Sequence, residues 1–168
     1  MTFKSPEEFH NKTGFIFHGM LALPLAVFAY LFLEIKNNHM NPVLQDGTIT
    51  MAILIAVPIL SAIIFWVGFK RFRRASKDIK GVPLAEKLSL YYDCTIKFYM
   101  SLGLASVLLV TGLYLTTSAV FILGYVFLLF FMSLHRPTPQ KYVKDIPLTE
   151  QERQVILNKG RFEDLENT

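Results

Sequence analysis

The chain has 168 residues, of which 52% are hydrophobic and only 18% are charged, and its formal net charge is +4. Ordinary soluble domains carry about 25% charged residues, and here three long stretches contain no Lys, Arg, Asp or Glu: residues 14–33, 49–69 and 98–134. These runs exclude an ordinary soluble domain, because ~20 consecutive apolar residues are enough for a helix to span a membrane.

The first two uncharged stretches each have the length of one span, and we expect membrane helices over residues 14–34 and 49–69. Before the first span, Ser5, Pro6 and Glu8 form a helix-start pattern, with Ser5 as the cap and Glu8 three residues later. We expect a short surface helix that runs into the span. The apolar stretch exceeds the ~7–15 residues of a signal-peptide core, so a retained span is favoured over a cleaved leader.

The third stretch has 37 residues. As one helix it would be about 55 Å long at 1.5 Å per residue, whereas the hydrocarbon core is ~30 Å thick. We therefore expect a hairpin that turns at the polar residues Thr116, Thr117 and Ser118, with spans over residues 97–115 and 118–134.

The charges between the spans predict how the chain lies in the membrane. Residues 35–48 contain one cation, Lys36, and the Thr-Thr-Ser turn contains none, whereas residues 70–90 contain seven and the segment after residue 134 contains six. Because basic loops stay in the cytoplasm, we expect both termini there. The predicted fold is an all-α, four-helix membrane bundle, multi-pass in a cell membrane, specifically the bacterial cytoplasmic (inner) membrane.

The predicted organisation is one membrane domain, residues 1–134, followed by a cytoplasmic tail, residues 135–168. In the tail, Thr149 and Glu152 match a capping box. They predict a short amphipathic helix over residues 150–159 that ends at a glycine.

A basic cluster directly follows the second span: Lys70, Arg71, Arg73 and Arg74. Basic clusters can bind nucleic acid, but after an apolar span such a cluster anchors the helix and contacts anionic lipid headgroups. We therefore expect the lipid bilayer and no nucleic acid as its partner. Beyond it, Pro83 begins an amphipathic segment that we expect at the membrane surface before the third span.

Small residues in membrane helices allow two backbones to approach closely. Four of them recur on one face of the first span: Gly19, Ala22, Ala26 and Ala29. We expect this small-residue face to make a tight helix contact.

Ionisable residues in or near the bilayer carry the chemical hypotheses, because they are costly there. His18, inside the first span, and His135, at the end of the fourth, could hold a haem b between them, although a hydrogen-bonded interface role is favoured for both. Glu34 could load ions or protons at the end of the first span, and Asp93 and Lys97 are spaced for an interfacial ion pair. No catalytic residue, metal ligand set or bound cofactor is predicted.

Three functions remain open from the sequence. The favoured one is a non-catalytic subunit or assembly factor of a larger membrane complex, which binds other membrane proteins or itself. The alternative is a small transporter or channel component. The third is a haem-binding redox membrane anchor. Because the sequence contains no nucleotide-binding, nucleophile-elbow or zinc-protease motif, an enzyme is disfavoured.

Overall fold

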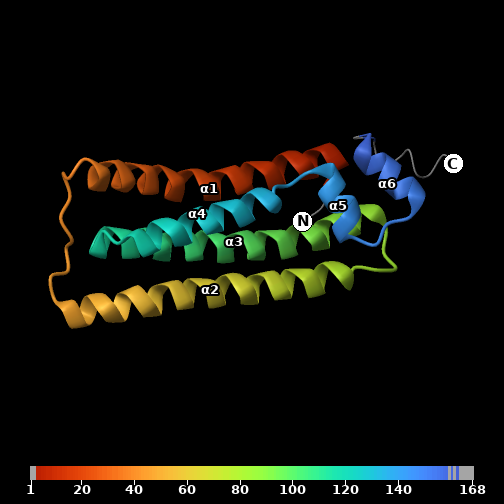
Figure 1. Cartoon of the computed structure of the whole chain (residues 1–168). Coiled ribbons are helices and arrows are strands. Elements are labelled where there is room, and N and C mark those ends of the chain that lie inside the picture. The colour runs from red at the N-terminus through yellow and green to blue at the C-terminus, as the bar shows by residue number, and fades with distance from the viewer. Residues whose placement is uncertain (1–2, 159, 161, 163–168) are drawn as a thin grey trace. The chain divides into compact units, whose positions relative to one another are not determined.

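The computed structural model describes residues 3–158, 160 and 162, and this part of the chain is helical, with no strand. Three long helices are followed by a shorter one and by two short helices near the C-terminus (Figure 1). Their bounds are α1 (Pro6–Lys36), α2 (Gly47–Lys77), α3 (Leu84–Thr116), α4 (Ala119–Leu134), α5 (Pro139–Asp145) and α6 (Glu150–Leu157).

Three of the described helices, α1, α2 and α3, are each long and apolar enough to cross a membrane. The fourth candidate is α4 taken together with α5, which follows it across a bend of 85°. The long helices have 31, 31 and 33 residues and so measure about 46–50 Å, more than the ~30 Å hydrocarbon core. They indicate a multi-pass membrane protein whose helices extend beyond the lipid.

The helices are longer than the predicted spans, because the polar segments next to the spans are also helical. The second helix runs on to Lys77 and the third begins at Leu84, so the basic connection shrinks from residues 70–90 to residues 78–83. Lys and Arg are good helix formers and are favourable at a helix C-terminus, whereas Gly81, with φ at 72°, interrupts the helix. The surface segment predicted after Pro83 is therefore the first part of α3.

The N-terminal half of α1 shows the same continuity. The predicted surface helix and first span form a single helix from Pro6 onward. The predicted cap is confirmed, because the Glu8 backbone N–H donates to Ser5 Oγ at 3.2 Å.

The predicted hairpin turn is confirmed at residues 116–118. The third helix ends at Thr116, whose hydroxyl donates to the Gly112 carbonyl at 2.8 Å, and α4 begins at Ala119. Between them Thr117 takes a left-handed conformation with φ at 52°, which reverses the chain.

The chain divides into two compact units that each draw on several segments. Unit 1 comprises residues 1–18, 69–99 and 135–168, and unit 2 comprises residues 19–68 and 100–134. One unit boundary coincides with the predicted limit of the membrane domain after residue 134. Of the 17 Lys and Arg residues, all except Lys36 fall in the sequence ranges of unit 1.

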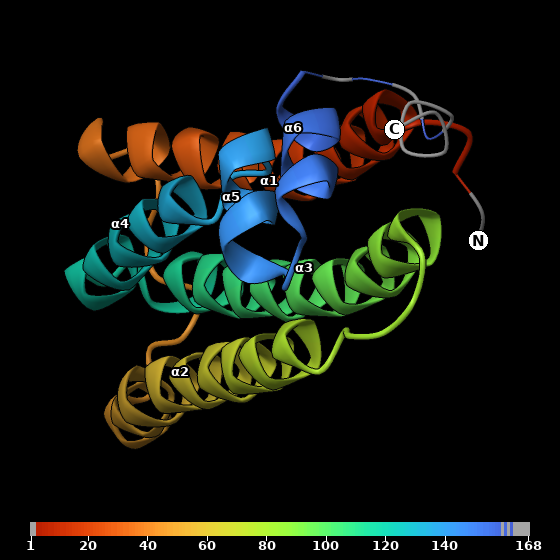
Figure 2. The same cartoon turned by 90° about the vertical axis from the view of Figure 1, so that its right-hand side faces the viewer.

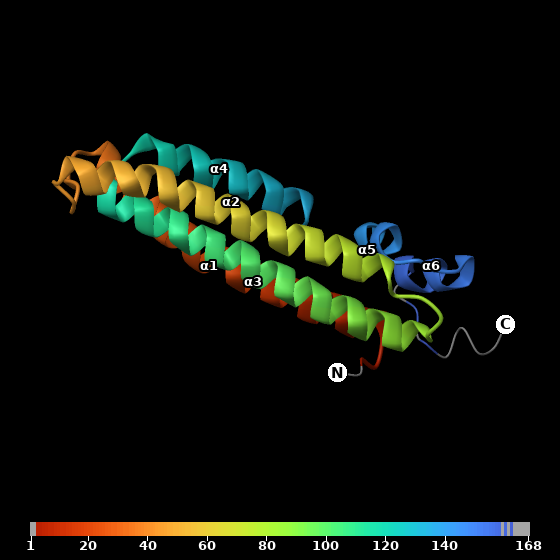
Figure 3. The same ribbon diagram turned by 90° about the horizontal axis from the view of Figure 1, so that it is seen from below.

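Unit 2 is built from four helical segments that run side by side (Figures 1 and 3). Phe28 of α1 stacks on Tyr125 of α4, with ring centroids 4.2 Å apart. The outer surface is also apolar, since Leu23 and Leu123 are each 72% exposed and Trp66 is 63% exposed. Such a surface is unusual in water and is suited to lipid.

The small-residue face of α1 (Gly19, Ala22, Ala26 and Ala29) is exposed along its whole length. The buried residues of this part of α1 are Pro24, Phe28 and Leu31. Large side chains therefore make the contacts inside unit 2, and within the described part of the chain the small-residue face makes no tight helix contact. Its expected contact with another helix stays a prediction.

In unit 2, α3 approaches α4 closely at Gly112, where a Cβ atom would overlap the Phe121 ring. Phe121 is fully buried, and side chains in close-packed interiors find few voids to move into. We expect Gly112→Ala to destabilise the purified protein by about 1–3 kcal/mol, measured as a lower thermal unfolding midpoint in mild detergent.

Gly103 provides the matched control, because a Cβ atom there meets no atom within 4 Å. Gly103→Ala should leave the midpoint unchanged or raise it, and Phe121→Leu should partly rescue Gly112→Ala. Equal midpoints for the two alanine variants would show that this close approach is not formed.

Candidate functional site

Unit 1 brings three aromatic side chains together from distant parts of the chain: Phe9 of α1, Tyr91 of α3 and Tyr142 of α5. Their ring centroids are 4.9 Å (Phe9–Tyr142), 5.8 Å (Tyr91–Tyr142) and 6.2 Å (Phe9–Tyr91) apart. Each residue is at most 2% exposed. This aromatic cluster forms a buried centre of unit 1. Figure 2 shows that α5, which supplies Tyr142, lies next to α6.

Polar partners satisfy both tyrosine hydroxyls at the edge of the cluster. The Tyr91 hydroxyl donates to Asp145 Oδ2 at 2.9 Å, and Lys141 Nζ lies 3.1 Å from the same oxygen. The Tyr142 hydroxyl lies 2.9 Å from Nδ1 of His10. Burial raises the pKa of Tyr142, so its hydroxyl stays protonated at neutral pH and can donate to the imidazole.

A buried ion pair holds α6 to α3. Lys87 Nζ donates to both carboxylate oxygens of Glu152 at 2.8 Å, and the two side chains are only 8% and 11% exposed. Burial alone would raise the pKa of Glu152, but the hydrogen bonds from Lys87 and from the Thr149 backbone N–H outweigh it and lower that pKa. The carboxylate is therefore ionised at neutral pH, and both of its oxygens accept hydrogen bonds.

The predicted capping box of the tail is confirmed. Thr149 Oγ1 accepts from the Glu152 N–H and the Glu152 carboxylate accepts from the Thr149 N–H. The helix ends at Leu157 rather than at the predicted residue 159, which lies outside the described residues. The Gly160 N–H donates to the Val155 carbonyl at 2.9 Å and so satisfies one carbonyl at the end of α6.

The sequence analysis missed α5, which supplies Tyr142 and Asp145. The signal was present in Thr138 and Pro139, because Thr138 caps the helix and Pro139 occupies its first turn. A helix of only 7 residues has too few turns to show a periodic apolar pattern.

The two histidines of the haem hypothesis both fall in unit 1 but have different neighbours. His18 is exposed, and its Nδ1 lies 2.6 Å from the Gly14 carbonyl of its own helix. His135 is half-buried, with its ring 5.3 Å from Phe69 and 5.4 Å from Phe98. Within the part of the chain that the structure describes, no three or more His, Cys, Asp or Glu side chains form a metal-binding group.

The remaining predicted contact residues lie at helix ends or on exposed faces. Glu34 is at the end of α1 in unit 2, with its carboxylate 3.7 Å from Nδ1 of His39. Asp93 and Lys97 are both exposed on α3 in unit 1. Their roles in ion, proton or interface contacts stay predictions.

The basic cluster has a clear orientation at the end of α2. Its four residues, Lys70, Arg71, Arg73 and Arg74, are all exposed. Phe72, between them, is 5% exposed and stacks on Phe98 at 5.1 Å. The helix therefore buries one aromatic ring and presents its cations outward, as contact with lipid headgroups requires.

No protein-family model matches the chain, and no curated protein or solved structure matches it. The geometry alone must therefore support a function. What the arrangement in unit 1 provides is a fixed position for α5 and α6, through an aromatic cluster and a buried ion pair.

Replacing Lys87 by Met would leave the Glu152 carboxylate buried without its cation. Breaking a buried ion pair in this way costs about 3–5 kcal/mol, so we expect α6 to detach from α3. Trypsin should then cleave the chain faster at Arg153, and mass spectrometry of the products over time measures that rate. Lys77→Met, at an exposed site on α2, is the control. The double variant Lys87→Met, Glu152→Leu should regain part of the protection, because it removes the unpaired charge but also the bond from the Thr149 N–H. Unchanged cleavage of Lys87→Met would contradict this role of the pair.

The lowered pKa of Glu152 also predicts how the attachment of α6 depends on pH. A carboxyl group with a lowered folded-state pKa contributes stability that is complete above its unfolded pKa of about 4.3 and is lost as the pH falls through the folded value. We expect hydrogen-exchange protection factors of α6 amides, corrected for intrinsic rates, to fall below about pH 4.3. In Glu152→Gln the protection factors of α6 should be lower and nearly independent of pH. If they depend on pH in the same way in both proteins, ionisation of Glu152 does not control the attachment of α6.

Proposed function

We propose that the chain is a non-catalytic subunit or assembly factor of a larger complex in the bacterial cytoplasmic membrane, which it crosses four times with both termini in the cytoplasm. The distribution of charge supports this topology. All cations except Lys36 belong to unit 1, and basic segments stay on the cytoplasmic side. The chain passes from unit 1 to unit 2 and back twice, as four crossings require.

The observation that carries the partner-binding role is the fixed position of α6. An isolated helix of 8 residues is not stable in water. Here the buried residues Glu152, Val155 and Ile156 hold one side of it. The other side, which includes Arg153 and Leu157, is exposed.

A helix that is held rigid while one face remains exposed is preorganised for a partner, because the partner does not have to order it on binding. Leu157, 45% exposed, gives this face an apolar contact point among polar residues. A mixed surface of this kind suits a protein partner at the cytoplasmic side of the membrane.

The small-residue face of α1 supports the same role within the lipid. Gly19, Ala22, Ala26 and Ala29 are exposed in the folded chain, and small residues allow another membrane helix to approach closely. A second helix there could come from a partner subunit or from another copy of this chain.

Site-specific crosslinking in the native host tests the proposal. A photoreactive amino acid at Leu157 should form one or a few discrete adducts with a partner protein, identified by mass spectrometry after solubilisation in mild detergent. Lys87→Met should reduce the adduct yield severalfold, because it detaches the helix that presents this position.

The control places the same photoreactive group at Asn37, an exposed residue of the connection between α1 and α2. That position should not yield the same adduct, because it faces the other side of the membrane in the proposed topology. A chain that purifies alone in mild detergent and gives no adduct from Leu157 would overturn the proposal.

A further inference from the structure

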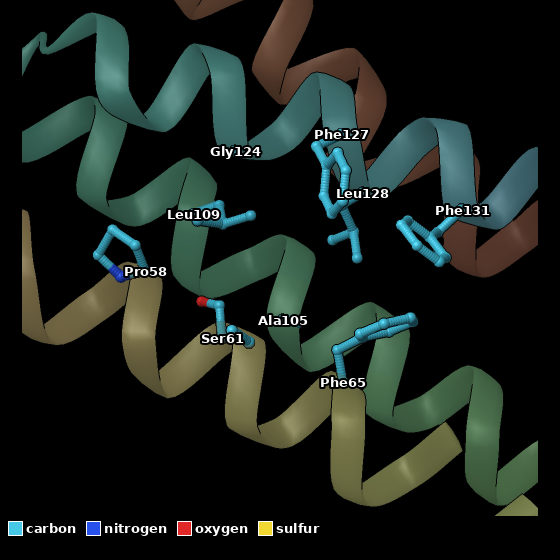
Figure 4. Close-up of a pocket in the computed structure, with 10 residues that line it drawn as sticks. Pro58, Ser61, Phe65, Ala105, Leu109, Gly124, Phe127, Leu128 and Phe131 are labelled. Atoms are coloured by element: carbon cyan, nitrogen blue, oxygen red, sulfur yellow. The ribbon is translucent and has the colours of Figure 1, made fainter. Parts of the chain in front are cut away.

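Unit 2 contains a cavity of about 140 Å³ between α2, α3 and α4, and it is partly open to the surface of the unit. Its wall includes Phe65 of α2 and Phe127 and Phe131 of α4 (Figure 4). The Phe131 ring lies edge-on to both others, with centroids 5.1 Å from Phe65 and 4.9 Å from Phe127. An apolar cavity of about 150 Å³ in another protein binds benzene, so this one has room for a single six-membered ring.

Ser61 supplies the one polar side chain among the described residues that line this cavity. It is 4% exposed, and its hydroxyl has no hydrogen-bond partner within residues 3–158, 160 and 162. A serine in a membrane helix commonly donates to the carbonyl four residues earlier, which here would be Val57, but Ser61 does not. In Figure 4 the Ser61 side chain extends from α2 toward α3, with its oxygen on the side of Pro58.

Buried hydroxyls nearly always have a partner. Four in the described part of the chain have none, those of Ser61, Thr95, Ser106 and Tyr125, and of these only Ser61 lines the cavity, where a bound molecule can supply the partner. Ser61 is eight residues from Phe69 and twelve from Ile49, the ends of the uncharged stretch of α2. These separations correspond to about 12 Å and 18 Å along the helix, which places Ser61 near the middle of a ~30 Å hydrocarbon core.

The depth limits what the molecule can be. At the middle of the bilayer a phospholipid offers only methylene groups, which can fill the cavity but cannot bond to the hydroxyl. A charged group is disfavoured at this depth. The remaining chemistry is a neutral molecule that dissolves in the membrane and carries a hydrogen-bonding oxygen directly on a ring.

We propose that this cavity binds a neutral, membrane-soluble ring compound whose six-membered ring packs against Phe65, Phe127 and Phe131 and whose ring-bound oxygen, a phenol hydroxyl or a ring carbonyl, bonds to Ser61. This small-molecule site goes beyond the partner-binding role and does not depend on it.

Fluorine NMR on the purified full-length chain in detergent micelles tests this site with two probes of equal size, 4-fluorophenol and 4-fluorotoluene. Empty micelles give the background. We expect saturable binding of both probes, and Ser61→Ala should weaken 4-fluorophenol about fivefold, the effect of one hydrogen bond, while the affinity for 4-fluorotoluene stays the same. Cyclohexanone is then added as a competitor of the bound probe. If it competes more strongly in the wild type than in Ser61→Ala, the ligand's oxygen is a ring carbonyl. If it does not, the ligand's oxygen is a phenol hydroxyl.

A pair of phenylalanine substitutions on α2 provides the matched controls. Ala62 lines the cavity and is exposed, so Ala62→Phe should fill it and abolish binding of both probes. Ala52 is exposed on the same helix and does not line the cavity, so Ala52→Phe should bind both probes like the wild type. Binding no stronger than in empty micelles, equal effects of Ser61→Ala on both probes, or retained binding in Ala62→Phe would each overturn the proposal.

Discussion

The cost of placing a charge in hydrocarbon is the constraint on which the whole structure depends. Ionised side chains are expensive in the bilayer, and a backbone that crosses it must satisfy its polar groups internally, which favours helices. The chain meets both demands by gathering every Lys and Arg except Lys36 into unit 1 and leaving unit 2 to apolar helices. The two units therefore differ in composition, and each is packed by different interactions.

Unit 1 has a buried aromatic centre whose tyrosine hydroxyls have polar partners, and a buried ion pair. The ion pair between Lys87 and Glu152 is buried, and the cost of removing two charges from water offsets much of the attraction between them. In this chain it fixes which part of the tail contacts α3. Unit 2 is stabilised differently, by close contacts such as Phe28 on Tyr125 and by the approach of Gly112 to Phe121. The cavity beside Ser61 is where this packing stays incomplete.

The sequence predicts the local features well, because they depend on signals within a few residues. The uncharged runs locate the apolar helices, the turn at residues 116–118 is found from its polar residues, and the caps at Ser5 and Thr149 are found from their spacing to a glutamate. It predicts the contacts between distant segments poorly. Tyr91 and Asp145 are 54 residues apart, and no local pattern pairs them. The small-residue face of α1 illustrates a further limit: periodicity shows that four residues share a face, but in lipid both the buried and the exposed faces are apolar, so the pattern cannot show which is which.

The topology is the central claim, and labelling of single cysteines in intact cells tests it most directly. In a Cys94→Ser background, a membrane-impermeant maleimide should label Asn41→Cys and Ser118→Cys from outside, because these positions join the spans at the charge-poor ends. Asp78→Cys and Lys144→Cys, in the basic segments, should be labelled only after the membrane is permeabilised. Labelling of Ser118→Cys from the same side as Asp78→Cys would mean that α3 and α4 do not form two crossings, and it would contradict the account.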